Sequence, residues 1–312
     1  MSLLGRALVG TGSAAAALAL NRVLVDRETR PAQADGGYLV GVPAGELHVV
    51  DEGDPDAPPT VLLHGFAGSL RWFDRLAPLL ARERRAIRLD LLGHGGSTKP
   101  RTGYSIEAQA EAVELALARL GVERAAFVGH AMGAAVAVAL AERGGELVER
   151  IAILDEAPDN DFGDQPLIAK LGFVPVLGEA IHRVVTDGMV RDGYADAFGE
   201  EFDLATGFDD PDQVVRDFRS MTYASYSGCW DAEDAFLAAT PLDERLRRLD
   251  LPALVVFGEQ DRFFRAQESA DAFRRVPRAR VETIPGCGHS PAVERPAELA
   301  PLVLELVATA AG

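Results

Sequence analysis

The sequence predicts an α/β fold in which a mostly parallel sheet of eight strands carries helices on both faces. Short apolar runs alternate with longer helical patterns along most of the 312 residues, and such connections join parallel strands. One strand passes into a helix through a turn that contains Gly129 and Gly133. One long stretch, residues 157–250, has only helical patterns, so we expect a helical insertion between two strands.

The expected strands are short apolar runs bounded by glycine, proline or charged residues, namely Tyr38–Val42, Leu47–Glu52, Val61–Leu63, Ala86–Leu89, Ala125–Val128, Ile151–Leu154, Ala253–Phe257 and Val281–Ile284. The expected core helices place apolar residues at helical spacing, namely Trp72–Leu80, Ile106–Leu120, Met132–Arg143, Ala266–Arg275 and Ala297–Ala308. Glycine, proline and aspartate punctuate the helices of the insertion, namely Leu167–Val185, Met189–Phe198, Pro211–Tyr223 and Asp231–Ala239.

We expect three parts in the chain. Residues 1–36 form an N-terminal apolar segment with a linker, residues 37–156 and 242–312 form the core, and residues 157–241 form a helical lid. A lid inserted at this point lies over the carboxyl ends of the strands, where α/β sheets bind ligands.

The N-terminal segment contains 14 residues without a charge, Ala7–Leu20. This run is short for a bilayer core of about 30 Å and is typical of a signal-peptide core or a short membrane-associated helix. Ala17-Leu18-Ala19 is a candidate cleavage site, and Ala32-Gln33-Ala34 is a poorer one. We therefore expect export or membrane association through residues 3–25. The alternative is a helix docked on a cytoplasmic protein.

The chain is acidic, with 48 Asp and Glu against 31 Lys and Arg and a net charge of −17. This balance excludes a generally basic, nucleic-acid-binding surface. Residues 157–241 alone carry a net charge of −12, which favours neutral or cationic apolar substrates over anionic ones. The two cysteines, Cys229 and Cys287, exclude a disulfide scaffold and a four-cysteine zinc site. No metal or cofactor motif occurs, so we expect neither group.

The strand-to-helix turn reads Gly129-His130-Ala131-Met132-Gly133. It has the spacing of the G-x-S-x-G turn that projects a nucleophile above a sheet. Ala131 stands at the nucleophile position and has no hydroxyl, thiol or carboxylate.

Three further segments also follow strands, and along the chain the elbow at Ala131 comes before the acid and the histidine. His64-Gly65-Phe66 follows the strand that ends at Leu63. Gly258-Glu259-Gln260-Asp261 places an aspartate after a later strand, and Gly286-Cys287-Gly288-His289 follows the last strand. Together with the run Asp90–Ser97 and the turn at Ala131, they resemble the α/β-hydrolase superfamily over about residues 38–310. The resemblance is to its lidded esterase, epoxide-hydrolase and C–C-hydrolase-like branch.

The resemblance implies an α/β-hydrolase fold and a role for each site residue. His289 is expected to be the general base, and Asp261 to orient it. The N–H groups of Phe66 and Met132 are expected to form an oxyanion hole. Several other polar residues are interpreted as structural: His64, His94, His130, Ser69, Ser97, Cys229 and Cys287. Tyrosines of the lid that resemble epoxide-polarising residues, namely Tyr194, Tyr223 and Tyr226, are interpreted as packing residues.

The surrounding residues look most like a serine carboxylic-ester hydrolase acting on a small or medium apolar, neutral substrate. With Ala131 in place of serine, efficient acyl-enzyme turnover is not expected. Three hypotheses explain the alanine. The serine was replaced by design to trap a ligand; the chain is a natural member that binds an apolar ligand or partner; or the His289–Asp261 pair acts as a general base without a covalent intermediate.

Overall fold

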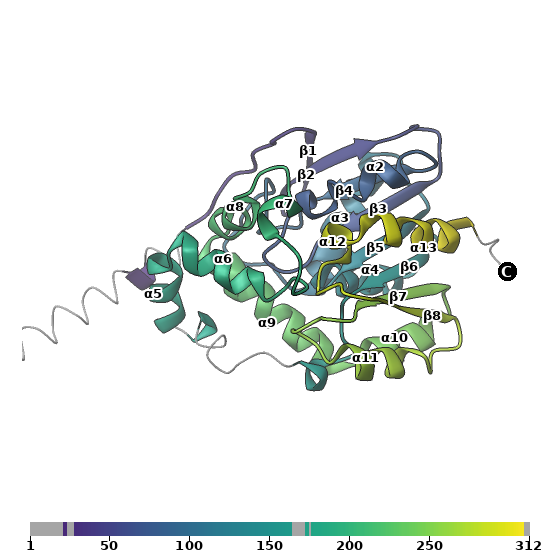
Figure 1. The fold of residues 1–312 in the computed structure, drawn as a ribbon. Coiled ribbons are helices and arrows are strands. Elements are labelled where there is room, and N and C mark those ends of the chain that lie inside the picture. The colour runs from purple at the N-terminus through teal and green to yellow at the C-terminus, as the bar shows by residue number, and fades with distance from the viewer. Residues whose placement is uncertain (1–20, 24–27, 164–171, 175, 309–312) are drawn as a thin grey trace, which may run out of the picture.

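The computed structural model describes residues 21–23, 28–163, 172–174 and 176–308. Its sheet has eight strands in the order β1-β2-β4-β3-β5-β6-β7-β8 (Figure 1). The strands are β1 (Tyr38–Val42), β2 (Gly45–Glu52), β3 (Pro59–Leu63), β4 (Arg85–Leu89), β5 (Ala125–His130), β6 (Val148–Leu154), β7 (Ala253–Gly258) and β8 (Ala279–Ile284). β2 runs antiparallel to β1 and to β4, and the other neighbouring pairs are parallel. The predicted mostly parallel sheet is confirmed.

Helices cover both faces of this sheet. Along β3, Val61 and Leu63 join one buried apolar cluster and Leu62 joins the other, because successive side chains of a strand point to opposite faces. The first cluster includes side chains of α3 (Ile106–Arg119), α4 (Met132–Glu142), α10 (Leu242–Leu249) and α11 (Ala266–Phe273). The second includes side chains of α2 (Ala77–Leu80), α12 (Pro291–Glu294) and α13 (Pro296–Ala308).

The predicted helix Trp72–Leu80 is wrong, because the chain there forms two short helices. A 3-10 turn, η1, spans Leu70–Phe73 and is capped by the Ser69 side chain, and α2 follows from Ala77. A continuous helix would set the ring of Pro78 against the carbonyl group four residues earlier, and Pro78 has no N–H to donate. In the first turn of α2, no helical carbonyl lies four residues before Pro78, so neither the ring nor the missing N–H disturbs the helix.

The insertion between β6 and β7 is helical, as expected, but several helix bounds differ. Its elements are η2 (Asn160–Phe162), α5 (Leu177–Val184), α6 (Asp187–Ala195), α7 (Leu204–Gly207), α8 (Gln213–Ser220) and α9 (Tyr223–Ala239). Val176 has a φ of 68°, a left-handed conformation that an α-helix cannot contain, so α5 starts after it. α9 is longer than predicted because Thr222 and Ser225 form a capping box that starts the helix there.

The insertion packs on the loops at the carboxyl ends of the strands (Figure 1). The N–H of His289 in the loop after β8 donates to the carbonyl of Ala197 at 2.8 Å. The Trp72 Nε1–H donates to Asp217 Oδ2 at 2.8 Å, and Trp72 lies in an apolar cluster with insertion residues such as Phe198 and Phe218. The insertion therefore covers the side of the core where the predicted site lies.

The predicted membrane segment lies mostly outside the described residues, including the whole of Ala7–Leu20 and the candidate cleavage site Ala17-Leu18-Ala19. Within the described end of the segment, Asn21 and Arg22 bind the buried carboxylate of Glu179 on α5. The linker then follows the core, with paired backbone hydrogen bonds between Arg30 and Lys99. Among the described residues, no helix has both the length and the apolar character needed to cross a bilayer.

Candidate active site

The turn between β5 and α4 holds Ala131 in a strained backbone conformation. Its φ is 46° and its ψ is −124°, a region that residues other than glycine rarely adopt. A Cβ at Gly129 would lie 2.4 Å from the backbone nitrogen of Ala134, and one at Gly133 would lie 2.1 Å from the carbonyl oxygen of Leu63. The two glycines therefore allow the strand, the helix and β3 to meet around a sharp elbow whose tip carries only a methyl group.

The loop after β3 passes directly beside this elbow. A Cβ at Gly65 would lie 3.0 Å from the Cβ of Ala131, so the backbone adjoining Phe66 lies close to the nucleophile position. On the other side, α4 begins at Met132, whose N–H is one of the first four in the helix and has no partner four residues earlier. The two predicted oxyanion-hole residues therefore both adjoin the Ala131 region. Binding of an oxyanion by their N–H groups stays a prediction.

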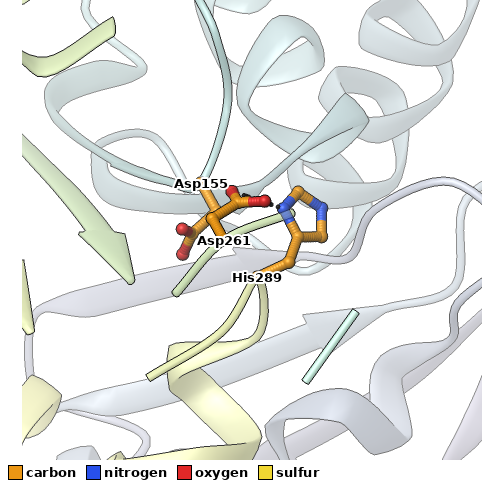
Figure 2. Close-up of side chains that lie close together, drawn as sticks. All are labelled: Asp155, Asp261 and His289. Atoms are coloured by element: carbon orange, nitrogen blue, oxygen red, sulfur yellow. Dashed lines mark hydrogen bonds and ion pairs between the residues drawn. The ribbon is translucent and has the colours of Figure 1, made fainter. Parts of the chain in front are cut away.

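Asp261 and His289 form a buried acid–base pair. The Nδ1 of His289 lies 2.9 Å from Asp261 Oδ2, and the side chains are 8% and 0% exposed (Figure 2). Asp261 Oδ1 accepts from the backbone N–H groups of Phe263 and Phe264 at 2.7 and 3.2 Å. Burial acts to raise the pKa of Asp261, but His289 and these two N–H groups outweigh it and hold the pKa below its usual value. An ionised Asp261 keeps a proton on Nδ1 and leaves Nε2 to accept one.

His130 supports this pair from within the elbow. Burial, with the nearby His289, lowers the pKa of His130 to about 3, so its ring is neutral. Its Nε2–H donates to the backbone carbonyl of His289 at 2.7 Å, and the two rings lie 4.9 Å apart. This geometry fits the structural interpretation of His130, because the ring fixes the histidine loop against the elbow.

The other two predicted structural histidines, His64 and His94, lie in the loops that follow β3 and β4. His64 Nε2 accepts from the N–H of Leu91 at 3.0 Å, and its ring lies 4.9 Å from that of His94. Burial lowers the pKa of both rings, and that of His94 falls well below its usual value. Both side chains are fully buried and neutral, which suits a packing role.

Asp155 is a residue of this site that the sequence reasoning missed. It follows β6 directly, has a φ of 44° and is fully buried. Its Oδ1 accepts from the N–H of Gly258 at 2.8 Å, whereas no hydrogen-bond donor reaches its Oδ2 among the described residues. Donor or acceptor atoms of Asp155, Asp261 and His289 all lie within 4.8 Å of one another (Figure 2).

Asp155 and Asp261 differ in protonation. Burial, together with the negative charge of Asp261, raises the pKa of Asp155 well above its usual value, while the pKa of Asp261 is lowered. Two adjacent carboxyl groups cannot both ionise at low cost. Asp155 is therefore the member of the pair that keeps its proton. A metal ion bound by these three residues would have to displace both this proton and the His289–Asp261 hydrogen bond, so the arrangement fits a protonated Asp155 beside an ionised Asp261 better.

The state of Asp155 gives a prediction with an isosteric control. Asp155→Asn is expected to keep the free energy of unfolding within about 1 kcal/mol of the parent, because the amide still accepts from the Gly258 N–H and, like the protonated acid, carries no charge. Asp155→Leu has a similar shape but no polar atoms. It is expected to destabilise the fold by about 1–3 kcal/mol, since the Gly258 N–H loses its acceptor. Urea unfolding measures the free energy of unfolding of both variants. If Asp155→Asn is destabilised as much as Asp155→Leu, Asp155 is ionised in the parent.

Aromatic rings close the site from the insertion side. The ring of Phe66 lies 5.0 Å from Tyr226 and 5.6 Å from Trp230, both on α9. Phe173 stacks on Trp230 at 4.3 Å. Tyr194 donates its hydroxyl hydrogen to the carbonyl of Ala67 at 2.6 Å, so this hydroxyl serves packing. The surroundings of Phe66 are therefore apolar and aromatic.

The two cysteines are structural in this arrangement. Cys229 and Cys287 are both 0% exposed, and burial raises the pKa of each thiol. A reactive cysteine needs a lowered pKa and access to solvent. Neither thiol replaces the missing nucleophile.

A family model described as the alpha/beta hydrolase fold matches residues 58–296. A dihydrolipoyllysine-residue acetyltransferase component of the acetoin cleaving system from Pseudomonas putida is 32% identical over 246 residues, or 76% of this chain. The chain spans 60% of the length of that relative. The magnesium-chelatase 30 kDa subunit of Rhodobacter capsulatus is 30% identical over 254 residues, covering 77% of this chain and 84% of that protein.

Solved structures show the same fold. A hydrolase from Pseudomonas aeruginosa superposes with a TM-score of 0.72 at 22% identity, covering 89% of this chain and 100% of that one. The enol-lactonase from Burkholderia xenovorans gives a TM-score of 0.70 at 23% identity, covering 87% and 100%. At these identities the likeness concerns the fold, and chemistry has to be argued from the residues at the site.

Proposed function

Because the chain belongs to the α/β-hydrolase fold family, we propose that it acts on a small or medium, neutral, apolar carbonyl compound without forming an acyl-enzyme. The carboxylic-ester type of site is the nearest match. In this function, His289 is the general base, Asp261 orients it, and the N–H groups of Phe66 and Met132 stabilise negative charge on the carbonyl oxygen. Water or the substrate itself, rather than residue 131, loses the proton.

The observation that carries this proposal is the intact acid–base pair beside an elbow without a nucleophile. The 2.9 Å hydrogen bond, the two N–H donors to Asp261 and the raised pKa of Asp155 all support an ionised Asp261. A buried charge that served no purpose would cost stability. Ala131, in turn, excludes attack by a side chain at the elbow.

His289→Gln tests this function directly. The parent protein is expected to hydrolyse short p-nitrophenyl esters slowly, at most about 10³–10⁴-fold above water, since the nucleophile is missing. The glutamine variant is expected to lose at least about 10²-fold of that rate, the usual contribution of a general base. Stopped assays with the enzyme in excess over the ester measure the hydrolysis rates of both proteins, and their melting temperatures show whether the variant is folded. Equal rates in the two proteins would contradict a general-base role.

A ligand-binding protein without turnover is the second candidate, and the aromatic rings around Phe66 favour it. Apolar ligands that raise the melting temperature, with no reaction of any ester or ketone, would support this candidate over the enzyme. We also infer that approach to the site favours neutral or cationic molecules, because the insertion carries a net charge of −12. Membrane association through residues 3–25 stays a prediction.

A further inference from the structure

Exposed apolar side chains gather around one helix of the insertion. In the part of the chain that the structure describes, seven large apolar residues are exposed to solvent. Six of them lie on α5, within five residues of either of its ends, or at residues 21–23, namely Val23, Val174, Val176, Leu177, Val184 and Met189. The seventh, Tyr38, lies on the edge strand β1. Because such gatherings mark interaction surfaces on soluble proteins, α5 is a candidate docking element.

α5 has its apolar side outward and its polar side inward. Leu177 and Val184 lie about two turns apart on one side of this helix, and they are 45% and 75% exposed. The opposite side carries Gly178, Glu179 and His182, of which the first two are buried. A surface helix of a globular protein normally has the reverse arrangement, with its apolar stripe against the core. The apolar stripe of α5 faces solvent instead.

Close contacts on the inner side fix this orientation. A Cβ at Gly178 would lie 2.0 Å from the carbonyl oxygen of Gly172 and 2.5 Å from the hydroxyl oxygen of Tyr223 on α9, so no side chain fits there. The ring of His182 lies 4.9 Å from that of Phe218 on α8. A rotation of α5 that buried its apolar side would break these contacts, so the exposure is built into the packing of the insertion.

The N-terminal segment joins the molecule at this same helix. Asn21 and Arg22, the first residues that the structure describes, bind the carboxylate of Glu179 on α5, and Figure 1 shows residues 21–23 beside this helix. The sequence just before them, Ala7–Leu20, has no charge and has the composition of a membrane-associated segment. When such a segment binds lipid, its attachment to Glu179 brings α5 to the same lipid surface.

The charges around α5 suit a neutral lipid surface. Residues 172–190 contain two acidic groups against one arginine, a net charge of −1, whereas the whole insertion carries −12. Both acidic groups are paired, Glu179 with Arg22, and Asp187 with Arg219 at 2.9 Å. Most of the acidic charge of the insertion is therefore on its other segments, and the apolar side of α5 can approach lipid without an unpaired carboxylate.

We propose that the outer side of α5, together with the exposed apolar residues beside it, docks on the surface of a lipid bilayer. This helix has eight residues, so it lies in the plane of the interface and does not span the membrane, with Leu177 and Val184 among the lipid chains. The interaction uses no residue of the acid–base pair or of the predicted oxyanion hole. It therefore stands or falls independently of the proposed function.

A fluorescent dye at position 184 of the full-length protein tests the docking. Because Cys229 and Cys287 are both buried, a thiol-reactive NBD dye is expected to label only the new cysteine of Val184→Cys. Phosphatidylcholine vesicles are used, since the net charge of −17 repels anionic lipids. The dye is expected to shift its emission to the blue and to be quenched by nitroxide-labelled phosphatidylcholine. The matched control is Tyr38→Cys, exposed on β1, whose dye is expected to stay in water and unquenched.

The position of the dye distinguishes docking of α5 from binding by the N-terminal segment alone. If the vesicles take up Val184→Cys but do not quench its dye, the segment binds lipid and α5 does not, which overturns the proposal and leaves the prediction for residues 3–25 standing. A blue-shifted dye without vesicles means that another part of the chain covers α5, or a second copy if the shift grows with protein concentration. Either result also overturns the proposal.

A double substitution measures the contribution of the apolar side. Leu177→Asn combined with Val184→Asn is expected to weaken partition into the same vesicles at least about 10-fold, because two aliphatic side chains no longer leave water. Tyr38→Asn is expected to partition like the parent. Both changes are at exposed positions, and melting temperatures show that the variants are folded. Equal partition of the parent and the folded double variant, or no partition of the parent, would refute docking.

Discussion

Ala131→Ser is expected to give the protein an esterase activity at least about 10³-fold above that of the parent. Removal of the serine from a complete triad costs roughly 10⁶-fold, so restoring it has a large effect if the remaining parts are in place. The elbow already has the strained backbone of a nucleophile position, and the Asp261–His289 hydrogen bond is formed. Hydrolysis of p-nitrophenyl acetate and butyrate, with a burst of p-nitrophenol from acylation, measures the gain.

The control for this gain is the double variant with His289→Gln. It is expected to lose the new activity, since the serine hydroxyl is weak without its base. A fluorophosphonate probe is expected to label the single variant and not the parent. A folded Ala131→Ser protein that stays unlabelled and inactive across an ester panel would contradict the serine-hydrolase origin of the site.

The protein is also expected to lose stability as the pH rises toward 7, and Asp217 is a main cause. This carboxyl on α8 is 2% exposed and accepts from Trp72 Nε1 and Gln213 Nε2 at 2.8 and 2.7 Å. Burial outweighs these hydrogen bonds and raises its pKa from 3.8 to about 7. The folded state therefore holds a proton that the unfolded chain releases, so stability is fully present below about pH 4 and falls until about pH 7.

Asp217→Asn isolates this contribution. The amide still accepts from Trp72 and cannot ionise. The loss of unfolding free energy between pH 4 and pH 7 is therefore expected to be smaller in this variant than in the parent, by a few kcal/mol. Chemical unfolding at several pH values measures it. Asp209→Asn, an exposed change in the same insertion, is the control and is expected to keep the parental slope. Asp155, Glu156 and Glu233 act in the same direction, so part of the slope remains. Identical curves for parent and Asp217→Asn would refute the prediction.

The sheet and the elbow were predictable because local patterns determine them. Strand ends and the two glycines at 129 and 133 mark the turn around Ala131, and the order of the motifs indicates which loops meet. The helix α10 was not among the predicted helices, although its sequence has a recognisable helical pattern. Leu242, Leu246 and Leu249 share one face, with acidic residues in its first turn and arginines in its last.

The carboxyl groups after β6 were not predictable in the same way. Asp155 and Glu156 stand directly after a strand predicted to end at Leu154, which was a usable signal. Asp261, whose negative charge helps to keep Asp155 protonated, lies far along the chain. Sequence spacing does not reveal whether two distant acids come close together, because tertiary packing of the loop after β7 decides it. The protonated state of Asp155 follows only from that packing.

The insertion begins and ends at one point of the core. The N–H of Leu242, where α10 starts, donates to the carbonyl of Pro158 at 2.7 Å, so the chain leaves β6 and returns beside its own point of departure. The hydrogen bonds between β6 and β7 do not depend on the segment in between. The helical insertion between β6 and β7 is therefore an exchangeable module. A chimera can replace it at the Pro158–Leu242 junction, and changes within it can alter the range of substrates while the sheet stays unchanged.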